Sequence, residues 1–463
     1  MKKKLMSFRE KILRFFKYDF ETILTFGIKL EQPYLRLCVG YISYIIFGTL
    51  LLTLPFMRRG PVGFLDNLFT AASAVSTTGL ATVDLAMNYN LAGQIVVLFL
   101  IQLGGLSYMT VSSFVMLKLT KHFTMIKKRV LQAEFSVPGG FDINNLVLNI
   151  VGFTIIFETV GAVLLYVFFK ASGADSPLWS AIFHSVSAFC TAGFSIYPDN
   201  LVQFDTNIGV NLVIMVLCYA GAMGYIVMYD LWKRIRIRKH KISFTTKVIV
   251  LVTLILTVFG TAEMFLFEPG IRQFSFFNRF LVSVFQTMSA LTTVGYNTVN
   301  VADFLPVSLM TVTLIMYFGA SPSGTGGGLK STTISAVFAY VKSKLSLQRD
   351  TYLFKHRIPT YRVDNALTTV LLYSFVLIFG SYLLSATERD ISYIQLIFEA
   401  GSALGTVGLS TGITAELSAW SKIILVFLMY IGRVGVLTIG YSMLLRMRSR
   451  TKLLGDVETD LAI

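Results

Sequence analysis

Four segments of this 463-residue chain align without a gap: LFTAASAVSTTGL (68–80), IFHSVSAFCTAGF (182–194), VFQTMSALTTVGY (284–296) and IFEAGSALGTVGL (397–409). They share the pattern F-x3-S-A-x2-T-x-G-[LFY]. Its glycines are spaced by 114, 102 and 113 residues. Five identities at fixed offsets in four places indicate internal duplication, and a repeat of this kind determines the whole architecture. The sequence therefore predicts four homologous units in one chain.

The residues around these segments are those of a membrane protein. Mean hydropathy is +0.69, 54% of the residues are hydrophobic and only 14% are charged, against about 25% in an ordinary soluble domain. Apolar stretches near the 20 residues that cross a bilayer recur from about residue 38 to 445. These runs are continuous rather than alternating, which argues against a barrel. The composition predicts an all-α polytopic membrane protein and excludes a soluble or disordered chain.

Each repeat segment lies between two long apolar stretches, with about 13 residues of its own before the Thr-x-Gly turn. That length is too short to span a membrane. Non-helical backbone at membrane depth persists only where protein or water covers it. We therefore expect a re-entrant pore helix that ends at the glycine and returns as an extended strand. Each unit is then helix, pore helix with filter strand, helix (M1-P-M2), which gives eight spanning helices around one pseudo-fourfold pore. The first helices are expected at about 38–56, 146–169, 247–268 and 365–386, and the second helices at about 93–117, 207–232, 305–341 (interrupted) and 419–445.

Basic residues concentrate between the units. The net charge is +15, and thirty of the forty Lys and Arg residues fall in segments 1–32, 118–145, 232–247, 342–364 and 446–463. The positive-inside rule predicts that these segments and both termini are cytoplasmic. Because the charge follows the membrane topology, it indicates contact with anionic membrane lipid and no nucleic acid.

The predicted organisation has six parts. They are a cytoplasmic N-terminal segment (1–32), pore unit one (33–117), a cytoplasmic link with unit two (118–232), a link with unit three and its interrupted second helix (233–341), a link with unit four (342–445) and a cytoplasmic tail (446–463).

Four such turns around an axis would form a pore lined by backbone carbonyls, which replace the hydration shell of K⁺. Glycine suits the turn because carbonyls that point one way require positive φ in places. The pore helices also direct the negative ends of their dipoles towards the pore centre, which favours a cation. No ring of acidic or basic residues accompanies the turns. The repeat therefore predicts a monovalent cation path.

The sequence TTVGY (292–296) resembles the potassium-channel signature, and the fourfold pattern resembles the KtrB/TrkH/HKT superfamily of potassium transporters. The segment GASPSGTGGGLKSTT (319–333) is similar to the bacterial KtrB-type ion-translocating subunit. The resemblance implies K⁺ at a selectivity filter, a homodimer in the bacterial cell membrane and a cytosolic nucleotide-binding ring subunit that holds ATP or ADP, with no cofactor in this chain. The filter carries over onto Ser76, Thr77, Thr78, Gly79, Cys190, Thr191, Ala192, Gly193, Thr292, Thr293, Val294, Gly295, Gly405, Thr406, Val407 and Gly408.

Selectivity stays open at this point. Plant relatives that carry sodium have Ser at the position of Gly79, so glycine there favours K⁺. However, Ala81 and Asn297 stand where channels have a second glycine, so a Na⁺ or mixed Na⁺/K⁺ path is an alternative. A conventional secondary transporter with inverted repeats is a further alternative, but the order of the basic links puts the start of every repeat on one side.

The second helix of unit three is interrupted by a loop of small residues, and Pro and Gly both break helices. A phosphate-binding loop is excluded because Leu329 replaces its required glycine, which leaves a packing kink or a gate below the filter. Arg433 lies deep in the last helix, where a charge is functional or paired. By the repeat alignment it is the counterpart of Ala320, so we expect it to anchor the loop or repel cations, or else to pair with Glu399. The candidate gating residues are Gly319, Pro322, Gly324, Gly326, Gly327, Gly328, Lys330 and Arg433.

Other polar residues are expected to be structural. Thr70, His184, Gln286 and Glu399 occupy one repeat position, where hydrogen bonds behind the filter are expected. Glu158 and Glu263, within first helices, are expected to pair with a pore-helix hydroxyl or amide, or else to couple to ions. No catalytic triad, paired carboxylates or metal spacing is present, and the three cysteines suggest no disulfide framework. The sequence thus predicts a transporter and no enzyme.

Overall fold

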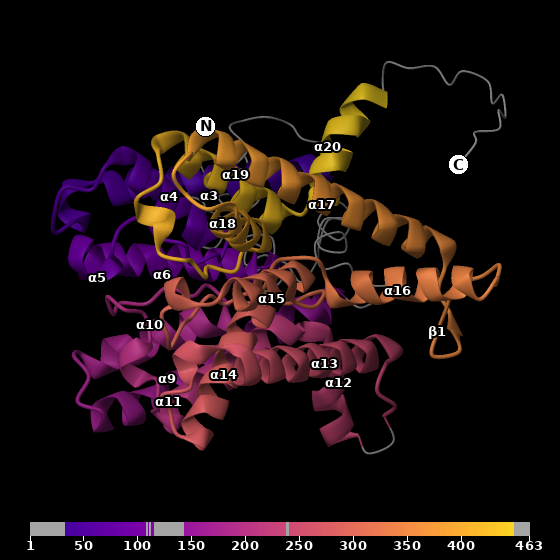
Figure 1. Ribbon diagram of the computed structural model, residues 1–463, viewed down its shortest axis with the longest axis horizontal. Coiled ribbons are helices and arrows are strands. Elements are labelled where there is room, and N and C mark those ends of the chain that lie inside the picture. The colour runs from indigo at the N-terminus through magenta and orange to yellow at the C-terminus, as the bar shows by residue number, and fades with distance from the viewer. Residues whose placement is uncertain (1–32, 108–109, 111–112, 115–142, 238–239, 449–463) are drawn as a thin grey trace, which may run out of the picture.

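The protein is predominantly helical, and its helices follow the fourfold order of the sequence (Figure 1). The computed structural model describes residues 33–448, with gaps at 108–109, 111–112, 115–142 and 238–239. The predictions for the N-terminal segment, for most of the first link and for residues 449–463 of the tail fall outside the described residues.

The first helix of each unit is long and apolar, as predicted. These helices are α3 (Pro33–Thr53), α9 (Ile143–Ala171), α13 (Phe244–Phe267) and α17 (Thr360–Thr387). All four are long and apolar enough to cross a membrane. Their bounds lie within a few residues of the expected ranges, because an apolar run of this length admits few alternatives.

The pore helices are also where the repeat predicts them. They are α4 (Phe64–Val75), α10 (Pro177–Phe189), α14 (Phe276–Thr292) and α18 (Tyr393–Gly405). Local signals define their starts. Pro177 is the first residue of α10, where a missing N–H costs nothing, and the Ser275 side chain accepts a hydrogen bond from Asn278 N at the start of α14.

The second helices differ from the expectation. Unit one has α6 (Leu91–Leu106), and the others are divided into α11 (Ile208–Met223) and α12 (Tyr225–Arg236), α15 (Pro306–Phe318) and α16 (Ser331–Leu345), and α19 (Ala419–Val434) and α20 (Val436–Arg448). Only the third was expected to be interrupted, so the continuous helices at 207–232 and 419–445 were wrong. The helix expected at 93–117 also ends early, at Leu106, and is followed by Ser107 with a φ of 65°. The chain turns by 103° at Gly224 and by 92° at Gly435. Both glycines have positive φ, of 84° and 91°, which other residues rarely adopt.

These breaks affect the count of membrane crossings. Within the described residues, length and composition identify four spanning helices, or up to six if each bent pair is one span, with α6 and α15 as shorter apolar helices. Eight spans therefore stay a prediction.

Short elements connect the helices. They are α5 (Leu85–Asn88), the 3-10 turns η2 (Pro55–Met57), η3 (Val202–Phe204), η4 (Pro269–Ile271), η5 (Val301–Asp303) and η6 (Ile413–Ala415), and a hairpin of β1 (Tyr352–Leu353) and β2 (His356–Arg357). The hairpin is antiparallel, with Tyr352 opposite Arg357. It lies beside the far end of α16, which extends away from the body of the protein (Figure 1).

Side-chain contacts join each unit to its neighbour. Trp179 Nε1 of unit two donates to Gln94 Oε1 of unit one over 2.7 Å. Tyr296 Oη of unit three donates to the Phe194 carbonyl of unit two over 3.0 Å. Lys422 Nζ on α19 lies 3.3 Å from Asp66 Oδ1 on α4. This last ion pair joins the fourth unit to the first, so the order of units closes on itself.

Candidate functional site

The four pore helices end in the same turn. In each, the repeat threonine donates its backbone N–H to the alanine three residues earlier, and the next residue donates to the serine five residues earlier. The first set joins Thr77, Thr191, Thr293 and Thr406 to Ala74, Ala188, Ala290 and Ala403 over 3.1–3.3 Å; the second joins Thr78, Ala192, Val294 and Val407 to Ser73, Ser187, Ser289 and Ser402 over 2.8–3.1 Å. This is the Schellman pattern of helix termination. These are backbone bonds, and two of the serines add a side-chain bond: Ser73 Oγ and Ser402 Oγ accept from Gly79 N and Gly408 N, each over 3.0 Å.

The threonines of these turns are left-handed, with φ of 53°, 50°, 56° and 49°. A residue with a Cβ holds this conformation only when its surroundings impose it. Two of the hydroxyls bond back to the preceding carbonyl: Thr77 Oγ1 donates to Ser76 O over 2.7 Å, and Thr191 Oγ1 to Cys190 O over 2.8 Å. The inner end of the turn is therefore fixed in backbone and side chain alike.

The repeat glycines bring the four turns together. All have positive φ, between 64° and 95°. A Cβ on each would overlap the carbonyl oxygen that precedes the glycine of the next unit: Gly79 faces Ala192 O, Gly193 faces Val294 O, Gly295 faces Val407 O and Gly408 faces Thr78 O. These contacts run through all four units in chain order and return to the first. The sixteen residues predicted for the filter thus include four carbonyls that are arranged as a ring.

Polar side chains brace this ring from behind, at the repeat position of Thr70. His184 contacts Ser180 O through Nδ1 at 2.7 Å and Ser195 Oγ through Nε2 at 2.9 Å. The Gln286 amide lies within hydrogen-bonding distance of Thr298. Glu399 accepts from Ser410 Oγ, from Thr411 N at 3.1 Å and from Thr414 Oγ1 at 3.0 Å. Each of these three joins its pore helix to the segment that follows the filter, as expected. The expectation is wrong for Thr70, whose hydroxyl has no hydrogen-bond partner in the described part of the chain.

The two glutamates of the first helices have different partners. Glu158 Oε2 accepts from Gln102 Nε2 over 3.2 Å, and Cys190 Sγ lies 3.8 Å from Glu158 Oε1. The amide partner of Glu158 thus lies on α6, and its contact with unit two is through the thiol of the first filter residue, so the expected pore-helix hydroxyl or amide is not the partner of its carboxylate. Glu263 accepts instead from Ser308 Oγ on α15 over 3.3 Å. The expectation of a pore-helix partner is therefore wrong for Glu263.

The interrupted segment of unit three lies directly against the four turns. Thr325 Oγ1 is 3.1 Å from Thr191 Oγ1 and donates to Phe189 O at 3.1 Å. Gly327 N donates to Thr293 Oγ1 over 3.1 Å, and a Cβ on Gly327 would overlap Thr406 Oγ1. Thr77 is contacted by Arg433, whose Nη1 donates to its hydroxyl over 3.0 Å. The loop and Arg433 together contact every threonine of the ring.

The loop also docks on the broken helix of unit two. Ser321 N and Thr325 N donate to Ala222 O and Gly221 O, each over 3.1 Å. Tyr225 N, at the start of α12, donates to Ser323 O over 3.2 Å. A Cβ on Gly224 would overlap Pro322 O. The break at Gly224 therefore provides the space that the loop occupies, and sequence analysis did not single out Gly224, Ser323 or Thr325.

Two glycines delimit the loop. Gly319 and Gly328 have φ of 45° and 70° and lie against each other. Ala320 N donates to Gly327 O over 3.1 Å, and Leu329 N to Tyr317 O over 3.3 Å. These backbone bonds hold the two ends of the loop together, and one glycine lies at each end. These are positions at which the backbone can change direction.

Arg433 links the loop to unit one. Its guanidinium donates to Thr325 O and to Gly104 O, besides Thr77. No carboxylate of the described chain forms an ion pair with Arg433, and Glu399 is satisfied by three other groups. The alternative of an Arg433–Glu399 pair is wrong, and the expected contact between Arg433 and the loop is present.

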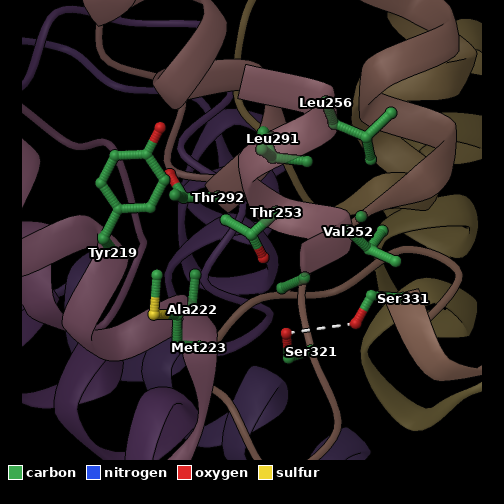
Figure 2. Close-up of a pocket in the computed structure, with 12 residues that line it drawn as sticks. Tyr219, Ala222, Met223, Val252, Thr253, Leu256, Leu291, Thr292, Ser321 and Ser331 are labelled. Carbon is green, nitrogen blue, oxygen red and sulfur yellow. Dashed lines mark hydrogen bonds between the residues drawn. The ribbon is translucent and has the colours of Figure 1, made fainter. Parts of the chain in front are cut away.

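A small pocket borders the outer side of the loop base (Figure 2). Figure 2 shows Val252, Thr253 and Leu256 of α13 on one side and Tyr219 and Met223 of α11 on the other. Ser321 and Ser331 lie at its edge, with their hydroxyls 3.2 Å apart. The pocket has a volume of only about 10 Å³, room for at most one water molecule, so the loop base is also packed on this side.

Comparisons with known proteins agree on one family. The model of the TrkH family, described as cation transport protein, matches residues 28–449. Ktr system potassium uptake protein B of Bacillus subtilis is 33% identical over 411 residues, which are 88% of this chain and 92% of that protein. Potassium/sodium uptake protein NtpJ of Enterococcus hirae is 32% identical and is matched over 93% of its length. The solved structure of the potassium transporter TrkH from Vibrio parahaemolyticus shares the fold, with a TM-score of 0.69 at 18% identity over 90% of this chain and 86% of that one.

The Glu399 brace gives a first prediction. Replacing Glu399 with Ala leaves Thr411 N without its acceptor, and leaves the hydroxyls of Ser410 and Thr414, which lie 2.9 Å apart, only each other to bond. Unpaired buried donors cost about 1–3 kcal/mol each, so we expect a clear loss of thermal stability in detergent, measured as the temperature at which monodisperse protein is lost. Glu399→Gln retains one acceptor oxygen, so its melting temperature should lie between those of the wild type and of E399A. Glu416→Ala, at an exposed glutamate on the same segment, is the control. Equal melting of E399A and E416A would contradict the bracing role.

Proposed function

The chain belongs to the TrkH family of cation transport proteins, and from this membership we propose that it is the ion-translocating subunit of a potassium uptake system. Membership in a transporter family also confirms the expectation that the chain is no enzyme. The observation that carries the proposal is the closed ring in which each repeat glycine faces a carbonyl of the next unit.

This ring has the chemistry that dehydrated K⁺ needs. Carbonyl oxygens replace the water around the ion, and four helix C-termini direct their negative dipole ends towards the same place. The turns carry no acidic side chain that would favour a divalent ion. Conduction is then channel-like and is driven by the membrane potential.

The proposed membrane arrangement has four M1-P-M2 units, eight spans and both termini in the cytoplasm of a bacterial cell. The four long apolar helices support it, as do the basic links between units. In this arrangement the broken second helices of units two to four each count as one crossing.

A mixed Na⁺/K⁺ path is the second candidate. It is favoured by Ala81 and Asn297, which replace the second glycine of channels, and by the similarity to a relative named a potassium/sodium uptake protein. The same transport assay separates the two candidates.

The test is uptake in cells that lack their own K⁺ uptake systems. We expect the wild-type chain to restore growth at low K⁺, and Gly→Ser variants of Gly79, Gly193, Gly295 and Gly408 to lose preference for K⁺ over Na⁺ by about tenfold or more, because the new side chain meets both positive φ and a neighbouring carbonyl. Such a loss corresponds to about 1.4 kcal/mol. Gly412→Ser is the control, since Gly412 also has positive φ but has open space around its Cα. Unchanged selectivity in all four well-expressed filter variants would contradict the filter.

We further propose that residues 319–330 form the gate. The loop contacts three of the threonines at the inner end of the filter, and Arg433, which is bonded to the loop, contacts the fourth, Thr77. Gly319 and Gly328, both with positive φ, provide hinges. A plain packing kink would need neither the contacts nor the hinges.

Shortening the loop tests the gate. Removal of residues 323–326 takes away the contacts to Thr191 while the filter turns remain, so we expect maximal K⁺ flux in proteoliposomes to rise several-fold. Arg433→Ala should also raise flux, because it releases Thr325 O and Thr77 together. Assembled variants that transport at the wild-type rate would refute the gate.

We also propose a homodimer and a separate cytosolic subunit that binds ATP or ADP. The relatives named as components of a Ktr system support a multi-component assembly. The basic link at 342–357 starts within the last turn of α16, the helix that begins where the loop ends, so a partner bound there can pull on the gate. Charge complementarity then favours an acidic docking surface on the partner.

Charge reversal tests this docking surface. Glutamate at Lys342, Lys344 and Arg349 should weaken capture of a soluble partner from the native cytosol and reduce the response of flux to ATP and ADP. Reversal of Lys170, on the side of the protein opposite to the links in the predicted topology, is the control. If no soluble protein co-purifies and nucleotides leave flux unchanged, the regulator does not exist, whereas the pore proposal stands.

A further inference from the structure

We infer that the loop forms a monovalent-cation site of its own below the filter, made by the carbonyls of Gly326 and Gly327, and that the ammonium of Lys330 fills this site while the loop is in place. The inference rests on the proposed function and adds the ligand of the gate to it. Lys330 is then a tethered cation that occupies the ion path.

The geometry around the ammonium is that of a cation on carbonyls. Lys330 Nζ lies 2.6 Å from Gly326 O and 3.4 Å from Gly327 O. No carboxylate of the described residues forms an ion pair with it. A lysine within a membrane-spanning protein is normally paired with an acid or with backbone carbonyls. Here backbone oxygens, the same groups that coordinate K⁺ in filters, take the place of that acid.

These carbonyls lie at the inner end of the ring. Gly327 N donates to Thr293 Oγ1 over 3.1 Å. A Cβ on Gly326 would lie 2.5 Å from the same hydroxyl and 2.9 Å from Thr292 O. The site is therefore one residue away from the filter turn of unit three. An ion that leaves the filter inwards meets it next.

A second cation strengthens the effect. Arg433 donates to Thr325 O, so three consecutive carbonyls of the loop, from Thr325 to Gly327, hold two positive side chains. In a medium of low dielectric, these charges repel an approaching K⁺. The closed loop thus blocks by charge as well as by volume.

Opening must remove the ammonium from its site. Lys330 immediately precedes α16, which starts at Ser331, so any displacement of α16 carries Lys330 with it. The vacated carbonyls then accept K⁺. Lysine and K⁺ compete for one site, and K⁺ should favour the open loop.

A purely structural role makes a different claim. Lys330 could serve only to tie the loop to its own helix, since Gly326 lies four residues earlier. In that case its exposure would not depend on which cation is present. The two readings therefore differ in how the amine responds to ions, independently of flux.

The first measurement is the acylation rate of Lys330 in the purified full-length protein, followed by mass spectrometry after short exposure to a water-soluble N-hydroxysuccinimide ester. Choline chloride is replaced stepwise by KCl at constant ionic strength. We expect K⁺ to raise the rate at Lys330 by roughly fivefold or more, a typical size for coupling between two ligands. Lys247, which is exposed on α13, is the internal reference and should not change. An equal rate in choline and in K⁺ would overturn the inference.

The second measurement is K⁺ flux in proteoliposomes. Lys330→Met retains the length of the side chain without the charge and should raise flux several-fold over wild type. Lys247→Met, the matched control, should leave flux unchanged. Wild-type flux in K330M refutes blocking by Lys330. If this variant does not fold, the acylation rate in the wild-type protein decides.

The two failures are distinguishable. If wild-type protein carries no K⁺ at all, the proposed function fails, and the acylation response still reports whether the loop binds the ion. If the wild type carries K⁺ but the acylation rate of Lys330 is the same in K⁺ and in choline, the proposed function stands and the inference about Lys330 fails.

Discussion

The contact between each repeat glycine and a carbonyl of the next unit is the constraint on which the rest of the structure depends. It leaves no room for a side chain at four positions, and it makes the backbone of one unit part of the surroundings of its neighbour. The pore helices must therefore end at one level and face one axis. The long helices behind them are packed to satisfy that requirement, and the Asp66–Lys422 pair joins the two ends of the series.

The threonine two residues earlier shows what the turn is for. A Schellman turn normally has glycine at its left-handed position, where a residue with a Cβ costs about 1–2 kcal/mol. All four copies have threonine there nonetheless. In three copies the hydroxyl is used, because Thr77, Thr191 and Thr293 each hydrogen-bond with the loop or with Arg433. In the fourth, Thr406 Oγ1 packs against Gly327 and has no hydrogen-bond partner among the described residues. In three of the four copies, strain in the backbone is thus retained where the side chain is used.

Much of this architecture could be predicted from the sequence, because repeats and apolar runs are local features. The first helices and the pore helices follow from length and composition, and the ring from the four-copy register. The breaks at Gly224 and Gly435 could not be predicted, since a single glycine in an apolar run is compatible with a straight helix. At Gly224 the cause is distant in sequence, as the chain turns where Pro322 and Ser323 of the loop meet it. The partner of Glu263 could not be predicted either, because Ser308 is 45 residues away in the sequence.

A single loop cannot make the same contact with each of the four equivalent turns of the ring. The Thr191 hydroxyl contacts the hydroxyl of Thr325, and Thr293 Oγ1 accepts from Gly327 N. Thr406 Oγ1 packs against Gly327, where a Cβ would overlap it. Thr77 is approached from α19, by the guanidinium of Arg433. Arg433 thus occupies the quadrant that the loop does not contact, and its bond to Thr325 O joins it to the loop. One asymmetric loop covers only part of a symmetric ring. This explains why Arg433, deep in the last helix, acts together with the loop of the third unit.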